Sequence, residues 1–389
     1  MPAGQAPHSL RAVSDQRLLD RFVRLCEIPS PTGSERAAAD AVLEELRAAG
    51  VGVAEDASAE VARAGAGNLI ARVPAAGGAE APYVAFFAHL DTVPHADPIR
   101  VELRDGVYRS AGETILGADN KAAVTVLVEL ALRAVARDGS AIGLELVFTV
   151  AEEDGLRGAR ELDVGALRAP FGYVLDHASP IGEVITAAPT YNRIVADFEG
   201  VEAHSGIRPE AGRSAIAAAA AAVGAMSLGR LDEETTANVG MITGGTASNV
   251  VAGHCRLEGE ARSLDAEKAG SVTARMVDAC TWAASEGGVD VDVDVVEMFR
   301  GYRLAAGSSA VRLAEEALSA CGHEPRRVAT GGGSDANALI ARGFEAVLLA
   351  NGTERNHTPA EAVAADRIVA MLAVCEAIAA RAAAGEAAA

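Results

Sequence analysis

The sequence predicts an α/β protein in which a mainly parallel sheet, flanked by helices, is interrupted by a second and smaller domain. Two observations favour this class. Short, continuously apolar runs alternate with helical stretches in the first half of the chain and again near its end, which is typical of a parallel sheet covered on both faces. Between these parts, strand-like and helix-like segments follow one another in a different order. With 389 residues, of which 50% are hydrophobic, the chain is long enough for more than one core.

Residues 1–188 are expected to form the first part of the main domain. Helical patterns cover 15–49 in two pieces, separated by the proline- and glycine-containing segment 28–33. A further helix is predicted over 121–135. Apolar runs predict strands at 68–73, 83–88, 143–150 and 173–175. In such sheets ligands bind beyond the carboxyl ends of the strands, so polar residues that follow these runs are the first candidates for a site.

Residues 189–301 are expected to form an inserted domain. The predicted segments are a strand at 191–199, a helix at 211–227, strands at 236–243 and 253–262, a helix at 265–286 and a strand at 289–298. This βαββαβ order is the ferredoxin-like pattern of a small two-layer domain. Residues 302–389 then complete the main domain, with a helix at 308–321, a strand at 346–349 and a long helix at 360–383. Insertion at a surface loop is well tolerated by a folded domain.

The charge and the terminal sequence exclude several classes of partner. Lys and Arg number 34 and Asp and Glu 54, so the net charge is −20, which repels nucleic acids and anionic membrane surfaces. No apolar run is expected to reach the length of a membrane span, and Met1 to Gln16 lack the apolar stretch of a secretory signal. The five cysteines are scattered and form no CxxC pair, which indicates a reducing compartment. We therefore expect a cytoplasmic protein.

Two polar pairs follow predicted strands directly. His89 and Asp91 come after the run 83–88, and a carboxylate at that spacing can orient the imidazole. Glu152 and Glu153 come after the run 144–151, where one carboxylate can bind a metal while the other acts as a general base. Taken alone, each pair is explained as well by a polar turn or a solvated acidic loop.

Three more polar residues fall at corresponding places. Asp119 opens a predicted helix, where it can bridge two cations or simply cap the helix. Asp176 follows the run 173–175, and His357 precedes the last predicted helix. Together the two histidines and the carboxylates are the ligands that two divalent ions require, with one carboxylate shared. The combination predicts a two-metal site at one edge of the sheet.

The order and content of these segments resemble the M20 metallopeptidases. The resemblance covers nearly the whole chain and is nearest to the peptidase T-like branch, which is related to tripeptidase, carboxypeptidase, aminoacylase and deacylase enzymes. It rests on HLDTV (89–93), GADNKAA (117–123), AEEDGLRGA (151–159), LDHA (175–178), EAHSGIRPEAGRSA (202–215), GGTASNVV (244–251), GEARS (259–263), GGGSDAN (331–337) and NHTPAE (356–361). It implies the fold of di-zinc exopeptidases, with the inserted domain as a lid and dimerisation domain.

The resemblance implies two divalent metal ions per subunit and a role for each candidate residue. The implied ligands are His89 and Asp176 for one ion, Glu153 and His357 for the other, and Asp119 as the bridge. Asp91 would orient His89, and Glu152 would be the general base for a metal-bridging water. Zinc is favoured by the ligand types, and manganese or cobalt also suits such sites.

The resemblance implies four residues on the substrate side, of which three lie in the inserted domain and the fourth, Gly333, lies in the last part of the main domain. His204 would stabilise the oxyanion, commonly in the active site of the partner subunit of a homodimer formed through this domain. Asn249 and Arg262 would hold the carboxylate of the substrate, and Gly333 belongs to a glycine loop that approaches it. Without the resemblance, His204 and Asn249 are ordinary turn residues and Arg262 is a surface charge.

Two departures from the tripeptidase pattern bear on the substrate. Asn120 stands where the tripeptidase usually has a second aspartate, and the segment HSGIRPEAG also differs, so tripeptide specificity is not implied. We expect a hydrolase that cleaves di- or tripeptides from one end. The first alternative is an N-acyl-amino-acid amidohydrolase such as a deacylase or desuccinylase. The second is a non-catalytic metal- or peptide-binding protein, which the presence of Glu152 disfavours.

Overall fold

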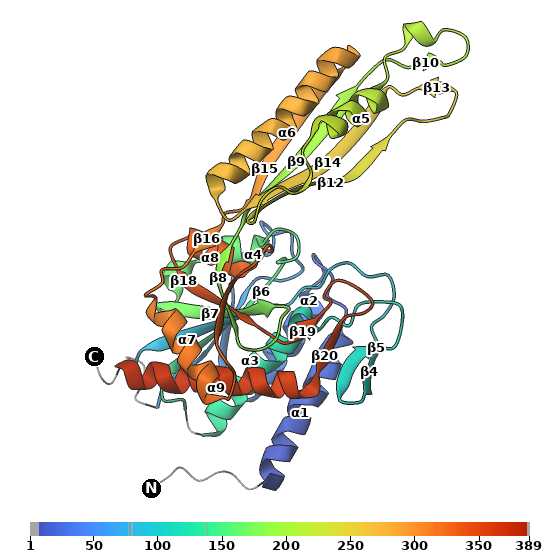
Figure 1. The fold of residues 1–389 in the computed structure, drawn as a ribbon. Helices are drawn as coiled ribbons and strands as arrows, with labels where there is room; N and C mark the ends of the chain where they lie inside the picture. The colour runs from blue at the N-terminus through green and yellow to red at the C-terminus, as the bar shows by residue number, and fades with distance from the viewer. Residues whose placement is uncertain (1–7, 77, 79–80, 138, 387–389) are drawn as a thin grey trace. The chain divides into compact units, whose positions relative to one another are not determined.

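The computed structural model describes residues 8–76, 78, 81–137 and 139–386 (Figure 1). The chain divides into two compact units. Unit 1 comprises Met1–Thr186, Leu304–Val328 and Ser334–Ala389, and unit 2 comprises Ala187–Arg303 and Ala329–Gly333. The sequence instead assigned 329–333 to the last part of the main domain. This segment joins unit 2 because Gly333 packs closely on the Phe299 ring and Arg262 donates to the Gly331 carbonyl.

The sheet of unit 1 has the spatial strand order β1-β2-β6-β3-β7-β18-β8, and β17 also pairs with β8. Its strands are β1 (Gly52–Glu55), β2 (Leu69–Val73), β3 (Tyr83–His89), β6 (Gly143–Thr149), β7 (Phe171–His177), β8 (Glu183–Ala188), β17 (Arg326–Ala329) and β18 (Glu345–Ala350). The central pairs β6–β3, β3–β7 and β7–β18 are parallel, whereas β1–β2, β2–β6 and β18–β8 are antiparallel. The predicted mainly parallel sheet is confirmed.

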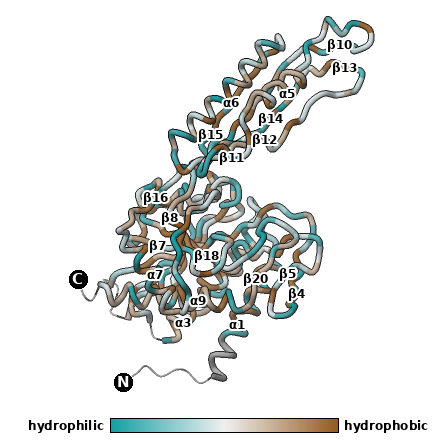
Figure 2. Tube along the Cα trace, viewed as in Figure 1, coloured by the Kyte–Doolittle hydropathy of each residue, from teal (hydrophilic) through white to brown (hydrophobic). Residues whose placement is uncertain are grey.

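The central strands are apolar because both faces of the sheet are covered. Every residue of β3 and β6 is buried. Figure 2, which colours the chain by hydropathy, shows hydrophobic segments around β18 of the same sheet. Phe86 belongs to the core that β3 shares with helices α1 (His8–Cys26), α2 (Arg36–Ala48), α3 (Ala118–Ala136), α7 (Ser309–Ala320) and α9 (Ala365–Glu386). The next residue, Phe87, points to the other face and meets Phe344 edge-on, beyond the end of α8 (Asp335–Ala341). Each such buried ring contributes roughly 1.5–3 kcal/mol to folding.

The segment before the last helix differs from the prediction. We expected the helix to cover 360–383, but α9 begins at Ala365. The preceding Ala362–Ala364 forms strand β20, which pairs antiparallel with β5 (Val107–Ser110). A small sheet of order β19-β20-β5-β4 results, with β19 at Thr353–Glu354 and β4 at Val101–Arg104. Pairing over such a sequence separation leaves no signal in the local pattern.

Helix α9 also contradicts the expectation that no apolar run reaches the length of a membrane span. The segment Ala365–Gly385 has the length and composition of a membrane-spanning helix, with a mean hydropathy of 1.8. However, 44% of its apolar window is buried inside the protein. Ile368, Met371 and Cys375 lie in the core of unit 1, so part of the apolar surface of α9 packs inside the protein.

Unit 2 is a two-layer domain. Its sheet has the order β11-β12-β14-β9-β15, and every pair in it is antiparallel. The strands are β9 (Thr190–Glu199), β11 (Gly229–Arg230), β12 (Thr235–Gly244), β14 (His254–Ser263) and β15 (Asp290–Phe299). Helices α5 (Ala215–Ala225) and α6 (Ala266–Gly287) pack on one face, and this βαββαβ order confirms the prediction. Ser214 caps α5, which therefore starts four residues later than expected.

Candidate active site

The candidate residues of unit 1 gather at one edge of its sheet because parallel strands end there together. His89 is the last residue of β3 and lies opposite Thr149, the last residue of β6. Asp176 lies near the end of β7, which pairs with β3 in parallel. Glu152 follows β6, and its backbone is drawn to the same edge by Asp91.

His89 is held with one ring nitrogen toward the backbone and the other toward carboxylates. The side chain is 1% exposed. Its Nδ1 lies 2.9 Å from the backbone oxygen of Asp91 and 3.5 Å from the nearer carboxylate oxygen of that residue. Its Nε2 lies 3.2 Å from Asp119 Oδ1 and 3.4 Å from Asp176 Oδ1. Donation from Nδ1 to the carbonyl leaves the Nε2 lone pair free to ligate a cation among these oxygens.

Asp119 lies between the two histidines. Its Oδ1 faces His89, and its Oδ2 is 3.1 Å from Nε2 of His357. The same nitrogen of His357 is 3.0 Å from Oε1 of Glu153. Each oxygen of one carboxylate therefore faces a different imidazole, which is the arrangement that a carboxylate needs to bridge two cations.

Asp91 holds the backbone of the acidic pair. Its carboxylate is fully buried and accepts the N–H groups of Glu152 at 3.0 Å and Glu153 at 3.2 Å. It also accepts the hydroxyl of Thr32 at 2.7 Å. Asp91 therefore faces the imidazole of His89, as predicted for it, and in addition fixes the backbone that carries Glu152. The contribution of Thr32 was missed, since nothing in the sequence shows that segment 28–33 lies beside residues 90–92.

Asn120 is a second residue that the sequence did not assign to the site. It is fully buried, and its Nδ2 donates to Asp176 Oδ1 at 3.2 Å. A deprotonated aspartate at this position has no proton to donate and would place another negative charge beside Asp176. The substitution noted in the sequence therefore has a local consequence, which is to hold Asp176 in place without adding charge.

The pKa values reflect several carboxyl groups buried close together. Burial, followed by the charge of Asp176, raises the pKa of Glu152 well above its ordinary value. Burial is also the largest cause that raises the pKa of Glu153 and of Asp176. For Asp119, burial is opposed by hydrogen bonds from His357 and His89, and the pKa falls below its usual range. Negative charge is concentrated here, and a cation relieves the repulsion.

Two groups of side chains in the described chain can each hold a metal ion. One is His89, Glu152 and Asp176, and the other is His89, Asp119 and Glu153. Within each group the candidate ligand atoms all lie within 4.8 Å of one another. Imidazole nitrogens and carboxylate oxygens suit hard or borderline divalent ions. The residues present therefore fit a metal centre.

In unit 2, His204 lies beside Asn249. His204 is in the short strand β10 (Ala203–His204), opposite Val250 of β13 (Val250–Val251), and the N–H of Ser205 donates to the Asn249 carbonyl at 3.0 Å. The imidazole is exposed, and its Nδ1 accepts the N–H of Gly206 at 3.2 Å. Strand β13, which pairs with β10, ends shortly before β14 begins at His254.

Arg262 lies near the other end of β14. Its guanidinium carbon is 4.2 Å from the centre of the Tyr191 ring, and it pairs with Glu260 at 3.0 Å. Its Nη1 donates to the Gly331 carbonyl at 3.2 Å, so Arg262 and the glycine segment with Gly333 lie together. The structure thus brings the four predicted residues of unit 2 together in two pairs, and the length of β14 separates the pairs.

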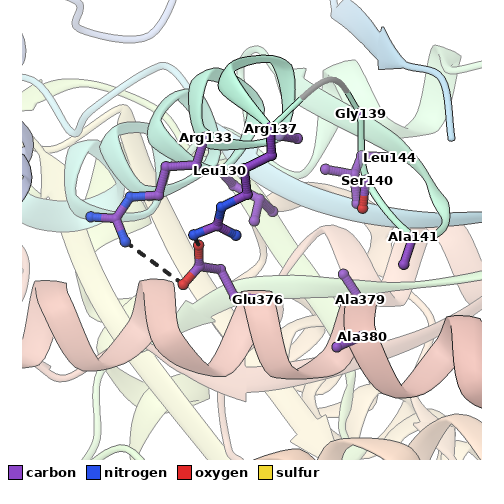
Figure 3. Close-up of a pocket in the computed structure, with 11 residues that line it drawn as sticks. Leu130, Arg133, Arg137, Gly139, Ser140, Ala141, Leu144, Glu376, Ala379 and Ala380 are labelled. Atoms are coloured by element: carbon purple, nitrogen blue, oxygen red, sulfur yellow. Dashed lines mark ion pairs between the residues drawn. The ribbon is translucent and has the colours of Figure 1, made fainter. Parts of the chain in front are cut away.

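A cavity of about 160 Å³ lies in unit 1, between the C-terminal end of α3 and α9 (Figure 3). Arg133 of α3 and Arg137, which follows this helix, reach Glu376 of α9 at 3.7 and 3.3 Å across its rim. None of the predicted site residues lines it. Leu130, which lines the cavity, lies about 16 Å along α3 from Asp119.

Comparison with known proteins identifies the family. Residues 191–288 match the peptidase dimerisation domain of the M20 family, and 68–171 match peptidase family M28. The aminopeptidase PepT of Bacillus cereus is 38% identical, covering 94% of this chain and 97% of its own, with a TM-score of 0.81. A tripeptidase of Staphylococcus aureus is 35% identical, covering 95% and 98%, with a TM-score of 0.87. The chain belongs to the M20 peptidase family.

Membership in the M20 family confirms the resemblance and the enzyme class, a metallopeptidase-type hydrolase. Acetylornithine deacetylase of Myxococcus xanthus is 30% identical over 335 residues, which cover 81% of this chain and 83% of that enzyme. The relatives include both peptidases and a deacylase. Family membership therefore does not determine whether the acyl part of the substrate is an amino acid or a simple acyl group. The individual roles of the site residues stay predictions.

Proposed function

We propose that this M20 protein is a two-metal exopeptidase that hydrolyses an amide bond in di- or tripeptides, with Glu152 as its general base. The observation that carries the proposal is the position of Asp119, whose two carboxylate oxygens face His89 and His357. One residue at this place can bridge two cations, and further ligand atoms lie on each side of it. No purely structural role requires two imidazoles on one buried carboxylate.

The proposed ligands divide into two sets around Asp119. His89 and Asp176 would hold one divalent cation, and Glu153 and His357 would hold the other, with zinc favoured by the mixture of nitrogen and oxygen ligands. When bound, the two cations lower the pKa of a shared water and polarise the scissile carbonyl. Manganese or cobalt would suit the same ligands.

The residues of the chain would supply the proton transfer. Glu152 is 8% exposed and is not needed in either proposed ligand set, so it is free to take a proton from the attacking water and give it to the leaving amine. Asp91 would fix the position of this carboxylate through the backbone N–H of Glu152. Asn120 would keep Asp176 oriented through its side-chain amide.

Unit 2 would supply the contacts to the substrate and the subunit interface. Arg262 presents a guanidinium, which suits the carboxylate of a peptide or an N-acyl amino acid, and Gly333 would lie in this subsite. Because the length of β14 separates Asn249 from Arg262 within one chain, Asn249 would reach the substrate carboxylate from the partner subunit, together with His204. His204, exposed on its ribbon, would donate to the oxyanion in the active site of the partner subunit.

A homodimer through unit 2 is part of this proposal. Strand β11 pairs only with Thr236 and Ala237 of β12, so no described strand pairs with the rest of that edge, which carries the exposed Met241 and Ile242. At the other edge, Asp290, Asp292 and Asp294 alternate with valines along β15. Their negative charges discourage pairing of this edge with a further strand. An uncharged open edge is suited to antiparallel pairing with a second copy.

We also propose a cytoplasmic location, without nucleic-acid or membrane partners. All five cysteines are free thiols, and four of them are buried. Free thiols persist in a reducing compartment. The net charge of −20 disfavours binding to phosphate-rich surfaces.

The test is metal content combined with hydrolysis. The purified protein would be stripped with a chelator, reloaded with zinc, manganese or cobalt, and assayed against dipeptides, tripeptides and N-acyl amino acids. We expect about two ions per chain and metal-dependent release of amino acids from the peptides. Hydrolysis of N-acyl amino acids alone would replace the peptidase proposal with the deacylase. Two bound ions with no hydrolysis would indicate a binding protein.

The deacylase is the second candidate because an acetylornithine deacetylase is among the relatives. The two reactions share the attack of water on an amide and the carboxylate on the leaving amine. They differ in whether the acyl side carries an amino group. The ratio of kcat/KM for a dipeptide to that for the matching N-acetyl amino acid therefore distinguishes them.

A further inference from the structure

Glu361 accepts three backbone N–H groups from the segment that contains Asp119. Its Oε2 accepts the N–H groups of Leu116 at 2.8 Å and Gly117 at 2.9 Å. Its Oε1 accepts the N–H of Asp119 at 2.8 Å. The residue is 1% exposed, so water does not compete for these donors. One carboxylate thus fixes the backbone immediately before and at the proposed bridging ligand.

The same residue lies in the segment that carries His357. The N–H of Glu361 closes a turn onto the Thr358 carbonyl at 3.0 Å. On its other side, Ala362 begins β20 and is fixed by pairing with Arg109 of β5. Glu361 therefore connects the two segments whose side chains meet where Asp119 Oδ2 faces His357 Nε2.

The charge of Glu361 is hard to explain by folding alone. It is buried beside Asp119, and the two negative charges repel one another. The three N–H groups are arranged around both oxygens of a carboxylate, and an amide in its place would turn one of these acceptors into a donor. The cost of burying a negative charge here is explained if Glu361 is needed to hold Asp119 in a fixed geometry relative to His357.

We propose that Glu361 is a positioning residue that sets the affinity of the metal ion held between Asp119, Glu153 and His357. This inference rests on the proposed two-metal function. The other ion shares Asp119, but its remaining ligands, His89 and Asp176, lie on strands β3 and β7, from which Glu361 accepts no hydrogen bond in the described structure. Loss of Glu361 therefore lowers the binding affinity of the ion between Asp119, Glu153 and His357 more than that of the other ion.

The experiment compares Glu361→Gln with wild type by calorimetric titration of the stripped, full-length protein with Zn²⁺. We expect wild type to bind two ions. The variant should bind the ion between Asp119, Glu153 and His357 about 10–100-fold more weakly, with a clearly smaller loss of affinity for the other ion, which shares only Asp119 with it. The absorption spectrum of the cobalt-loaded protein is the second readout, because it reports the geometry around each ion. We expect its bands to change in the variant even at saturating cobalt.

A matched control is Glu354→Gln, which removes a negative charge from the exposed side of neighbouring β19. We expect it to bind both ions as wild type does. Glu361→Asp keeps the charge but shortens the reach to the three N–H groups, and it is titrated in the same way if Glu361→Gln does not fold. We expect Glu361→Asp also to lose affinity for one ion.

The outcomes separate the inference from the proposed function. If wild-type protein binds no pair of ions, the two-metal proposal is wrong, and this inference with it. If wild type binds two ions and folded Glu361→Gln or Glu361→Asp binds both equally well with an unchanged cobalt spectrum, Glu361 has only a structural role. Equal weakening of both ions would also overturn the inference, because it would show that Glu361 does not act on one site.

Discussion

His89 and Asp119 of unit 1 are held in a different way from His204 of unit 2. In unit 1, His89 is 1% exposed and Asp119 8% exposed, and each is held by partners from other segments. In unit 2, His204 is exposed, and the hydrogen bond to its imidazole comes from Gly206, two residues away. The difference teaches that the proposed metal ligands are placed by folding of one unit alone. The proposed contact of His204 to the oxyanion, by contrast, would form only when a substrate and a second subunit are present.

The largest expected effect tests the chemistry assigned to unit 1. Glu152→Gln keeps the size of the side chain but removes the base, so we expect kcat to fall by up to about 10⁴-fold. Metal content measured by elemental analysis should stay at the wild-type value, because the glutamate is outside the proposed ligand sets. Wild-type kcat in this variant would assign the proton transfer to another group.

The next effect tests whether unit 2 acts in another subunit. His204→Ala removes a donor to the oxyanion, and we expect kcat to fall about 10²–10³-fold with the metals retained. Mixing denatured Glu152→Gln and His204→Ala chains and refolding them together should restore about a quarter of wild-type turnover, since half of the dimers are mixed and each has one intact site. No recovery in dimers shown to be mixed would place His204 in its own subunit's site.

A smaller effect is expected on substrate affinity. Arg262→Met removes the charged contact to the substrate carboxylate, and we expect KM to rise about 10–100-fold while kcat changes less. Steady-state kinetics with a dipeptide and with its C-terminal amide provide the check, because the amide should be affected little. A fall in kcat with unchanged KM would show that Arg262 does not bind the substrate's ground state.

The smallest expected effects are on the free energy of unfolding. They compare a buried ion pair in unit 1 with exposed ion pairs in unit 2. In unit 1, Glu129 is 2% exposed and pairs with Arg21 at 2.9 Å, so Glu129→Gln should lower the free energy of unfolding by about 1–2 kcal/mol at pH 7. In unit 2, Glu258 is paired with Arg193 and Arg256 on an exposed face, so Glu258→Gln should change it by less than about 1 kcal/mol. Urea denaturation measures both.

The pH dependence sharpens this last comparison. Burial raises the pKa of Glu129, but hydrogen bonds from Arg133 and Arg21 outweigh it and lower the pKa below its ordinary value. A carboxyl group with a lowered folded pKa contributes stability above its unfolded pKa, about 4.3, and loses it as the pH falls. The stability difference between wild type and Glu129→Gln should therefore shrink between pH 6 and pH 3. A constant difference would show that packing, and not charge, is responsible.

Much of the fold could be predicted from local patterns. The apolar runs that became β3 and β6 are buried on both faces, and burial of that kind leaves a continuous hydrophobic signature. The βαββαβ order of unit 2 was readable because its strands and helices are long and separated by turn residues. The start of α9 was misplaced, since β20 exists only through pairing with the distant β5.

The sequence by itself determined the residue types of the site and their places at strand ends, because strands and their termini are encoded locally and parallel strands end at a common edge. Only the tertiary structure decided that Asp119 faces both His89 and His357, that Asn120 donates to Asp176, and that Glu361 holds the segment before Asp119. These contacts join segments as far apart as residues 119 and 361. Their geometry depends on how whole elements pack, which no local pattern records.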